Sequence, residues 1–330
     1  MRIVTNFERF PDVWEASNGM HGVSEFAPDR SSFLEHSGHR DAVFVVNCDP
    51  RLVLALARAR ILGRHDRPIV AVDLVLRNPR TVRERILAIE KRFTLKRVDF
   101  FLHYFKDFAG IDERYGIGGS SADFVNFKAN LWDRRVNGPQ PEGEYVLCFG
   151  RSLRDYDTFF EAVELAGVPA AIVDPTLSQV RSHGSRFSRP LGSLPANIQI
   201  LPDDMSNDSQ ALLLSNARIV TVPLVRGSLV ASGISTILNA MVLGKCVVAS
   251  EGPGVSDLFD REVLKFPPEN AQALAQLLRR AWDDRELRTA TALAGWTYGI
   301  GCGSEQDLFQ RIVDKVAARQ SVFGHDPALA

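Results

Sequence analysis

The chain has 330 residues, 45% of them hydrophobic and 24% charged, which is typical of a globular protein long enough for two domains. Its 39 Lys and Arg residues nearly balance 40 Asp and Glu, and the formal net charge of -1 argues against a nucleic-acid-binding protein. No apolar run reaches the roughly 20 residues of a membrane span, and the first residues lack the apolar core of a signal peptide, so we expect a cytoplasmic protein.

The first forty residues are the least regular part of the chain. Residues 2–6 could be a first strand, but the sequence then becomes polar and rich in Gly, Ser and His. We expect a solvated loop that carries His21, Glu25 and Asp29. The alternative is that this loop takes part in binding an acceptor substrate.

A regular alternation of apolar strands and helical segments begins at Asp41. Strands are expected at 42–47, 68–72 and 98–102, and helices at 50–62, 81–94 and 107–115. Strands that alternate with helices predict a parallel sheet with right-handed crossovers. The first half should therefore be one α/β domain.

Three polar residues lie at the carboxyl ends of these strands: Asn47 is the last residue of its strand, and Asp73 and His103 directly follow theirs. In open parallel sheets ligands bind beyond the carboxyl ends of the strands, so the three are candidates for one shared cleft. Asp73 and His103 are the candidate catalytic residues. The alternative is that each is a strand-end polar group that caps a neighbouring helix.

The segment 77–97 is strongly basic. It carries Arg77, Arg80, Arg83, Arg85, Lys91, Arg92, Lys96 and Arg97, interleaved with Val82, Ile86, Leu87, Ile89 and Phe93. An amphipathic helix of this kind usually packs its apolar side on its own domain. It can also lie on an anionic membrane surface, so we keep peripheral membrane contact through 77–97 as a second interpretation.

A polar stretch rich in Gly, Pro and Asn near the midpoint predicts a domain boundary. We place an N-terminal domain at 1–135, a linker at 136–144 and a C-terminal domain at 145–330. Strands in the second half are expected at 145–149, 170–173, 198–201, 218–223 and 245–249. The final helices run from 270 to about 318, and the last of them could pack back on the N-terminal domain.

The stretch 227–259 holds the strongest local signal. Apolar residues recur at helical spacing from Ile234, Gly244 ends that helix, and Ser232 is a plausible N-cap. The free N–H groups at a glycine-led helix start after Gly233 form a ready anion site. The alternative is an ordinary strand–glycine–helix unit of an α/β protein.

Three stretches of the second half carry a resemblance to a known family. They are YVLCFGRSLRDYDTFFEAV at 145–163, NARIVTVPL at 216–224 and ISTILNAMVLGKCVVAS at 234–250. This half resembles the donor-binding domain of GT-B glycosyltransferases, closest to the retaining, nucleotide-sugar-dependent class known as glycosyl transferases group 1. The resemblance implies an α/β fold of two Rossmann-like domains that face each other across a cleft.

The resemblance also implies a donor site. Arg151 would contact the donor diphosphate, Arg154 would replace a lysine of the family, and the helix after Gly233 would lie under the diphosphate and ribose. The paired glutamates of the family fall on Ala231 and Asn239, of which Asn239 could still hydrogen-bond a ribose. The implied donor-binding residues are Gly150, Arg151, Arg154, Ser232, Gly233, Ile234, Ser235, Thr236 and Asn239.

We therefore predict a glycosyltransferase, of hexosyltransferase type, that uses a UDP- or GDP-sugar as substrate and needs no cofactor. Four scattered cysteines without a Cys-x-x-Cys pair argue against structural zinc, and we see no cluster of His and carboxylates spaced for a metal. We therefore expect arginines and a helix start to neutralise the leaving diphosphate. The acceptor could be a lipid-linked glycan or polysaccharide intermediate at the inner membrane face. Alternatives are a UDP-sugar epimerase or hydrolase, and a non-catalytic protein that binds nucleotide-sugars or glycans.

Overall fold

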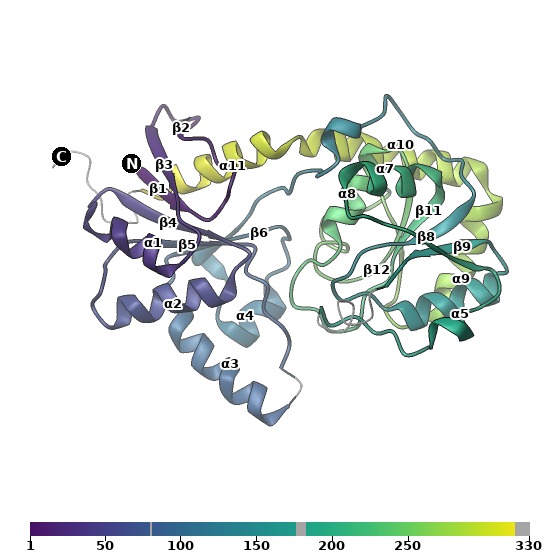
Figure 1. Ribbon diagram of the computed structural model, residues 1–330, viewed down its shortest axis with the longest axis horizontal. Coiled ribbons are helices and arrows are strands. Elements are labelled where there is room, and N and C mark those ends of the chain that lie inside the picture. The colour runs from purple at the N-terminus through teal and green to yellow at the C-terminus, as the bar shows by residue number, and fades with distance from the viewer. Residues whose placement is uncertain (80, 176–182, 321–330) are drawn as a thin grey trace. The chain divides into compact units, whose positions relative to one another are not determined.

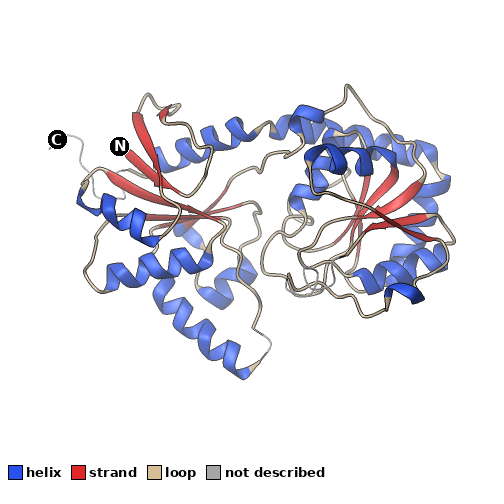
Figure 2. Ribbon diagram, viewed as in Figure 1, coloured by secondary structure: helices blue, strands red, loops and turns tan. Residues whose placement is uncertain are grey.

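The computed structural model describes residues 1–79, 81–175 and 183–320, and it divides into two compact units (Figures 1 and 2). Unit 1 contains Met1–Asn126 and the described residues from Gln306 onward, and unit 2 contains Phe127–Glu305. Each unit is a largely parallel sheet covered by helices, so the predicted pair of α/β domains is confirmed.

The predicted boundary at 136–144 is wrong, because this segment packs along unit 2. The Val136 N–H donates to the Val242 carbonyl at 3.0 Å, and Trp296 Nε1 donates to the Val136 carbonyl at 2.9 Å. Further on, Lys245 Nζ donates to the Glu142 carbonyl at 3.0 Å. Gly and Pro marked an irregular backbone correctly, but an irregular segment can still be hydrogen-bonded along one domain.

Unit 1 is built on a seven-stranded sheet of order β2-β3-β1-β4-β5-β6-β7, in which β2 is antiparallel to β3 and the other pairs are parallel. The strands are β1 (Arg2–Thr5), β2 (Val13–Glu15), β3 (His21–Phe26), β4 (Ala42–Asn47), β5 (Ile69–Val72), β6 (Phe100–His103) and β7 (Ala122–Phe124). The helices are α1 (Arg30–Glu35), α2 (Pro50–Ile61), α3 (Val82–Leu95), α4 (Ala109–Tyr115) and α11 (Glu305–Ala317).

The solvated loop expected before residue 40 is wrong. His21 begins β3, Glu25 pairs with Arg2 and lies 3.0 Å from His36 Nδ1, and Asp29 caps α1 by accepting from the Ser32 amide at 3.0 Å. Strand β3 lies near the sheet edge and none of its residues is fully buried. Its sequence therefore lacks the apolar run that identifies an interior strand.

The last helix, α11, packs on unit 1, so the chain returns to the domain in which it began. The Phe309 ring lies 5.3 Å from that of Phe7, and Lys315 Nζ lies 2.6 Å from the carboxylate of Asp123. The yellow helix in Figure 1 follows this return. Aromatic packing and an ion pair together fix its register on the sheet.

Unit 2 is a six-stranded parallel sheet of order β10-β9-β8-β11-β12-β13. The strands are β8 (Tyr145–Cys148), β9 (Ala170–Val173), β10 (Ile198–Leu201), β11 (Ala217–Val222), β12 (Cys246–Ser250) and β13 (Leu264–Phe266). The helices are α5 (Tyr156–Ala166), α7 (Asn207–Asn216), α8 (Ile234–Val242), α9 (Ala271–Asp283) and α10 (Arg285–Cys302). The three-residue β13 was not predicted, because so short a run carries no readable pattern.

Short 3-10 turns connect several of these elements. They lie at His36–Gly38, Gly119–Ser121, Trp132–Arg134 and Leu191–Ser193. Within the residues that the structure describes, no helix combines the length and the apolar character needed to cross a membrane.

Local sequence explains where the main helices begin. Asp49 accepts from the amides of Arg51 and Leu52 at 2.9 Å and 2.9 Å, with Pro50 in the first turn of α2. Thr81 and Glu84 form a capping box at the start of α3. Side-chain oxygens before the helix satisfy amides that have no acceptor within it.

The order of the strands in unit 2 indicates where a ligand would bind. The sequence runs outward from β8 through β9 to β10 on one side and from β11 through β12 to β13 on the other. The direction of winding therefore reverses between β8 and β11. In doubly wound sheets the crevice outside the carboxyl ends at such a reversal is the usual ligand site.

Candidate functional site

At the carboxyl edge of unit 1, Cys48 and Asp73 lie side by side. They follow the paired strands β4 and β5, and the Cys48 thiol donates to Asp73 Oδ2 at 3.2 Å. Both residues have left-handed backbone angles, with φ of 49° and 48°. Such angles in non-glycine residues cost free energy and often occur at functional sites. Burial raises the pKa of the Asp73 carboxyl to about 6, and the hydrogen bond from Cys48 acts in the opposite direction.

The other predicted strand-end residue, Asn47, is held by a neighbouring loop. Its N–H donates to Asn6 Oδ1 at 2.7 Å, and Asn6 Nδ2 donates to the Asn47 carbonyl at 3.0 Å. These bonds tie the ends of β1 and β4 together. Asn47 thus has a structural role at the edge where Asp73 also lies.

His103 lies inside unit 1, contrary to the catalytic role predicted for it. Its side chain has 0% exposure and its ring lies 4.9 Å from that of Phe105 and 5.4 Å from that of Phe108. Neither ring nitrogen has a hydrogen-bond partner in the described part of the chain. Burial lowers the pKa of His103 to about 4, so the imidazole is neutral at pH 7. A ring in this position has no access to a substrate.

Asp73 and His103 should affect stability in opposite directions between about pH 4 and 6. The folded pKa of Asp73, about 6, lies above its ordinary 3.8, so its contribution to stability is lost as pH rises. The folded pKa of His103, about 4, lies below its ordinary 6.5, so its contribution is lost as pH falls. Each shift of about two units corresponds to roughly 3 kcal/mol.

We therefore expect Asp73→Asn to make the free energy of unfolding rise more steeply from pH 4 to pH 6 than in the wild type. His103→Phe should make the same rise shallower. Urea unfolding at several pH values checks both slopes. Parallel curves for the wild type and the two variants would contradict the assigned burial of these groups.

In unit 2, the turn after β8 and the loop after β11 form the carboxyl edge at the reversal point. The Asp155 N–H donates to the Pro223 carbonyl at 2.9 Å, and the Val225 N–H donates to the Leu153 carbonyl at 3.0 Å. Gly150 has a φ of +102°, and an added Cβ there would collide with the Arg154 guanidinium. Both the backbone conformation and the lack of space for a Cβ therefore require glycine at position 150.

Arg154 is a buried brace of this edge, with only 2% of its area exposed. Its Nε donates to the Phe149 carbonyl at 2.8 Å, Nη1 to the Ser152 carbonyl at 2.9 Å, and Nη2 to Thr236 Oγ1 at 3.1 Å. Burial lowers the pKa of Arg154, but a guanidinium keeps its charge in proteins. The predicted direct contact of Arg154 with a donor is replaced by a role beneath the site.

Helix α8 begins at Ile234, and its N-cap is Gly233, which has a φ of +82°, so the predicted N-cap role of Ser232 is wrong. No side chain caps this helix start. Gly233 lies against the Arg154 guanidinium: an added Cβ would be 3.1 Å from Nη1. Amides at a helix start lack acceptors within the helix, so a guanidinium and a helix N-terminus together make this edge electropositive.

Most of the predicted donor-binding side chains in and just before α8 are buried. Ser232, Ile234 and Thr236 are buried, and the Ser235 hydroxyl accepts from Asn130 Nδ2 at 2.6 Å. Asn239 is 2% exposed, and its Oδ1 accepts from the Leu131 N–H at 3.0 Å. Burial therefore argues against the predicted contact of Asn239 with a ribose. The backbone amides of the first turn, which no side chain caps, are the groups of this helix best suited to meet an anion.

Arg151 is the exposed arginine of the turn after β8. Its Nη1 lies 3.5 Å from Met205 Sδ, in the loop after β10. The structure therefore brings the predicted phosphate-binding arginine to the loop 203–205. The loop after Asp174, at the end of β9, falls partly outside the described residues.

A pocket of about 270 Å³ lies at the same edge of unit 2. The loops after β11, β12 and β13 line it, through Leu224, Val225, Gly227, Ser228, Glu251, Gly252, Pro253 and Pro268. Glu251 is an exposed carboxylate in this lining that the sequence analysis did not select. It directly follows β12, so the same strand-end rule that selected Asp73 could have found it.

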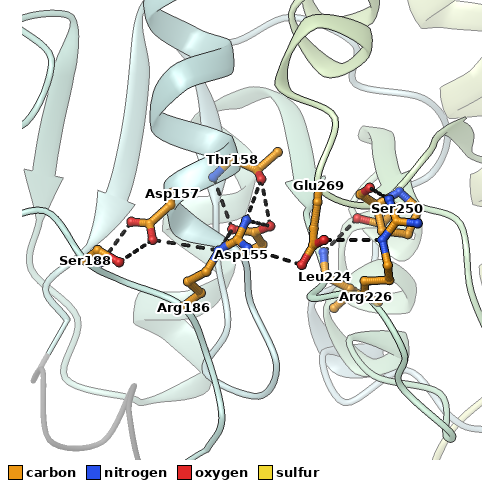
Figure 3. A network of polar contacts seen from close by, with 10 residues as sticks. Asp155, Asp157, Thr158, Arg186, Ser188, Leu224, Arg226, Ser250 and Glu269 are labelled. Atoms are coloured by element: carbon orange, nitrogen blue, oxygen red, sulfur yellow. Dashed lines mark hydrogen bonds and ion pairs between the residues drawn. The ribbon is translucent and has the colours of Figure 1, made fainter.

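Ion pairs hold these loops in place (Figure 3). Arg186 binds the fully buried Asp155, with Nη2 at 2.6 Å from Oδ2, and its Nη1 lies 3.2 Å from Glu269 Oε1. Arg226 Nε contacts the other oxygen of Glu269 at 3.2 Å. The network joins the start of α5 to the loops after β11 and β13. It fixes one wall of the pocket, and its Arg186–Asp155 pair is a fork of two parallel hydrogen bonds.

Asp155-Tyr156-Asp157 has an Asp-x-Asp spacing that could hold a metal ion, and the prediction of a metal-independent site did not take it into account. Asp155 is used by Arg186, and Asp157 accepts from the Ser188 amide at 2.8 Å and its hydroxyl at 2.7 Å. Across residues 1–79, 81–175 and 183–320, no three His, Cys, Asp or Glu side chains converge as metal ligands.

Comparison with known proteins places this geometry in a family context. Residues 193–295 match the family model described as Glycosyl transferases group 1. No curated protein sequence matches the chain.

Solved structures share the fold across most of the chain. HepE from Anabaena, in complex with UDP and glucose, has a TM-score of 0.66 and 14% identity over 90% of this chain and 86% of its own. Sucrose-phosphate synthase from Thermosynechococcus elongatus has a TM-score of 0.61 and 14% identity, over 98% of this chain and 89% of its own. An alpha,alpha-trehalose 6-phosphate synthase from Burkholderia multivorans has a TM-score of 0.61 and 13% identity, over 96% of this chain and 89% of its own. The chain therefore has the GT-B glycosyltransferase fold.

Proposed function

From the GT-B fold and the match of residues 193–295 to glycosyl transferases group 1, we propose that this protein transfers a sugar from a nucleotide-diphosphate sugar to an acceptor hydroxyl. In that reaction the bond from the anomeric carbon to the diphosphate oxygen breaks. A bond from the acceptor oxygen to the same carbon forms, and the acceptor hydroxyl loses its proton. The charge left on the diphosphate is what the protein has to stabilise.

The observation that carries the proposal is the electropositive edge of unit 2 at the reversal point of its sheet. The exposed Arg151 and the uncapped start of α8 provide donors for the diphosphate, and the buried Arg154 adds a fixed positive charge behind them. These groups supply charge stabilisation by themselves, which is why we propose a metal-independent reaction without a cofactor.

We propose a UDP- or GDP-hexose as donor, with its sugar in the pocket next to Glu251. A carboxylate in the pocket lining can accept hydrogen bonds from sugar hydroxyls. HepE was solved with UDP and glucose, which supports a uridine donor by analogy of fold. Asp73, held by Cys48, is the proposed group on the acceptor side, either as a base or as a contact of the sugar.

As acceptor we propose a lipid-linked glycan or polysaccharide intermediate, reached by peripheral contact of segment 77–97 with the inner membrane face. What supports this class is the surface of unit 1. Large apolar side chains of α3 lie exposed there among arginines and lysines. An enzyme that works on a lipid-linked substrate gains from remaining at the bilayer surface.

The first test is thermal melting with UDP, GDP, TDP, ADP and CMP, each with magnesium and with EDTA. One nucleoside diphosphate should raise the melting temperature equally under both conditions, because a ligand of the folded state stabilises it by mass action. Arg151→Ala should weaken the binding of that nucleotide by about tenfold to a hundredfold, which is the contribution of one or two charge-assisted hydrogen bonds.

Arg280→Ala is the matched control, since this exposed arginine lies near the far end of α9. It should bind the nucleotide as the wild type does. Binding that requires magnesium would overturn metal independence, and the absence of binding to any nucleotide would overturn the donor site.

One observation favours a second candidate, a protein that binds nucleotide-sugars without catalysis. Ala231 stands at one glutamate position of the family and is packed against Gly254. A Cβ added at Gly254 would lie 2.5 Å from the Cβ of Ala231. Asn239 stands at the other position and is buried. Nucleotide binding without any release of diphosphate from the matching nucleotide-sugar, with crude lipid acceptors present, would favour this candidate.

A further inference from the structure

Helix α3 turns four of its large apolar side chains away from the unit to which it belongs. Val82, Ile86, Ile89 and Phe93, here named the α3 stripe, are 73%, 63%, 58% and 65% exposed. Their spacing of four, three and four residues places them within an arc of about 60° on one side of the helix. Figure 1 shows α3 at the outer side of the helices of unit 1.

The opposite side of α3 does the packing. Ala88, Thr94 and Leu95 are its buried residues, and the two apolar ones lie across the helix from the stripe. The expected arrangement, in which the apolar side of this helix packs on the domain, is therefore wrong. A short stripe of four exposed large apolar residues on one helix face is unusual for a surface without a partner.

Contacts with α2 and α4 hold helix α3 in place. Arg58 of α2 lies 2.7 Å from Glu90, and Arg92 Nη1 donates to the Glu113 carbonyl of α4 at 2.7 Å. The capping box of Thr81 and Glu84 fixes the start of the helix. The helix is thus formed and oriented before any partner arrives, which limits the entropy lost on binding.

Positive charge surrounds the stripe. Both glutamates of the helix are already engaged, Glu84 by the capping box and Glu90 by Arg58. The described cations of the segment are Arg77, Arg83, Arg85, Lys91, Arg92, Lys96 and Arg97, and Arg80 lies outside the described residues. The surface therefore combines a narrow apolar stripe with an excess of positive charge.

We propose that α3 docks on an anionic lipid bilayer, with the α3 stripe inserted among the headgroups and the flanking arginines and lysines on lipid phosphates. The charge decides between occupants, because a second copy of the chain would place two cationic surfaces against each other. An anionic bilayer complements the charge and accepts the apolar side chains. This inference deepens the proposed acceptor class, but docking itself requires no catalysis.

The test is co-sedimentation of the full chain with vesicles of phosphatidylcholine containing about 30% phosphatidylglycerol, at low ionic strength. The wild type should bind, and the double variant Ile86→Glu, Phe93→Glu should lose at least about tenfold in bound fraction, because it places carboxylates in the headgroup region. Arg83→Gln with Arg85→Gln should weaken binding and reduce its dependence on salt.

Leu212→Glu is the control, since Leu212 is 63% exposed on α7 of unit 2 and should leave vesicle binding unchanged. Circular dichroism and nucleotide melting identify any variant that fails to fold. If the wild type binds vesicles but binds no nucleotide, the proposed function is contradicted and this inference is not.

Two results would overturn the membrane proposal. One is equal sedimentation of the wild type and the α3 double variant. The other is a wild type that does not bind vesicles and is a dimer by sedimentation velocity, which the double variant converts to a monomer. The second result would assign the α3 stripe to an interface between copies.

Discussion

Arg154→Met should lower the free energy of unfolding by about 3 kcal/mol, the largest stability effect we expect from a single polar residue of this protein. The guanidinium satisfies the Phe149 and Ser152 carbonyls and the Thr236 hydroxyl at once. Removing a buried charge returns part of its desolvation cost, but the acceptors of the buried residues Phe149 and Thr236 would lose their donor. Arg154→Lys should recover little, because an ammonium on a flexible stem cannot replace the planar fork.

Urea unfolding followed by tryptophan fluorescence measures this effect, since Trp132, Trp282 and Trp296 all lie in unit 2. Arg151→Ala is the matched control in the same turn. Arg151 is exposed, so its loss should change stability by no more than about 0.5 kcal/mol while it weakens nucleotide binding. A change below about 1 kcal/mol for Arg154→Met would contradict the role of a buried brace.

Gly233→Ala should cost about 2 to 4 kcal/mol and weaken nucleotide binding as well. The residue has a φ of +82°, and an added Cβ would lie 2.6 Å from Val222 Cγ1 and 3.1 Å from the Arg154 guanidinium. The left-handed backbone contributes about 1 to 2 kcal/mol, and overpacking adds a similar amount. The displaced helix start would no longer present its amides in the same place.

Gly19→Ala separates the two causes. Gly19 has the same φ of +82°, but an added Cβ there meets nothing within 4 Å. It should show the backbone cost alone and leave nucleotide binding intact. Equal destabilisation by Gly19→Ala and Gly233→Ala, measured by urea unfolding, would mean that the contact with Arg154 and Val222 has no energetic weight.

Much of the fold could be read from the sequence because its interior strands are continuous apolar runs. The runs predicted at 42–47 and 245–249 form strands at 42–47 and 246–250. The prediction failed where burial is partial or the element is short, as in β3 and β13. It also failed at the linker, because irregular backbone and separation between domains produce the same composition.

The candidate site was located by a local rule but not resolved by it. Strand ends and the glycine-led helix start brought Asp73, Arg151 and Gly233 to the edges where a ligand is expected. The direction of each side chain was beyond that rule. His103 at the end of β6 turns into an aromatic interior, and Glu251 at the end of β12 lines a pocket.

The sequence by itself determined the class of protein: alternating strands and helices, a family-like second half and a basic amphipathic segment. Only the tertiary structure decided which of those polar and apolar groups are accessible. Arg154 and Asn239 are buried by contacts from segments distant in the sequence or from a folded turn, whereas the α3 stripe is exposed although it is apolar. The physical reason is that spacing along a helix or strand fixes which residues share a face, but the direction of that face depends on what packs against the other side.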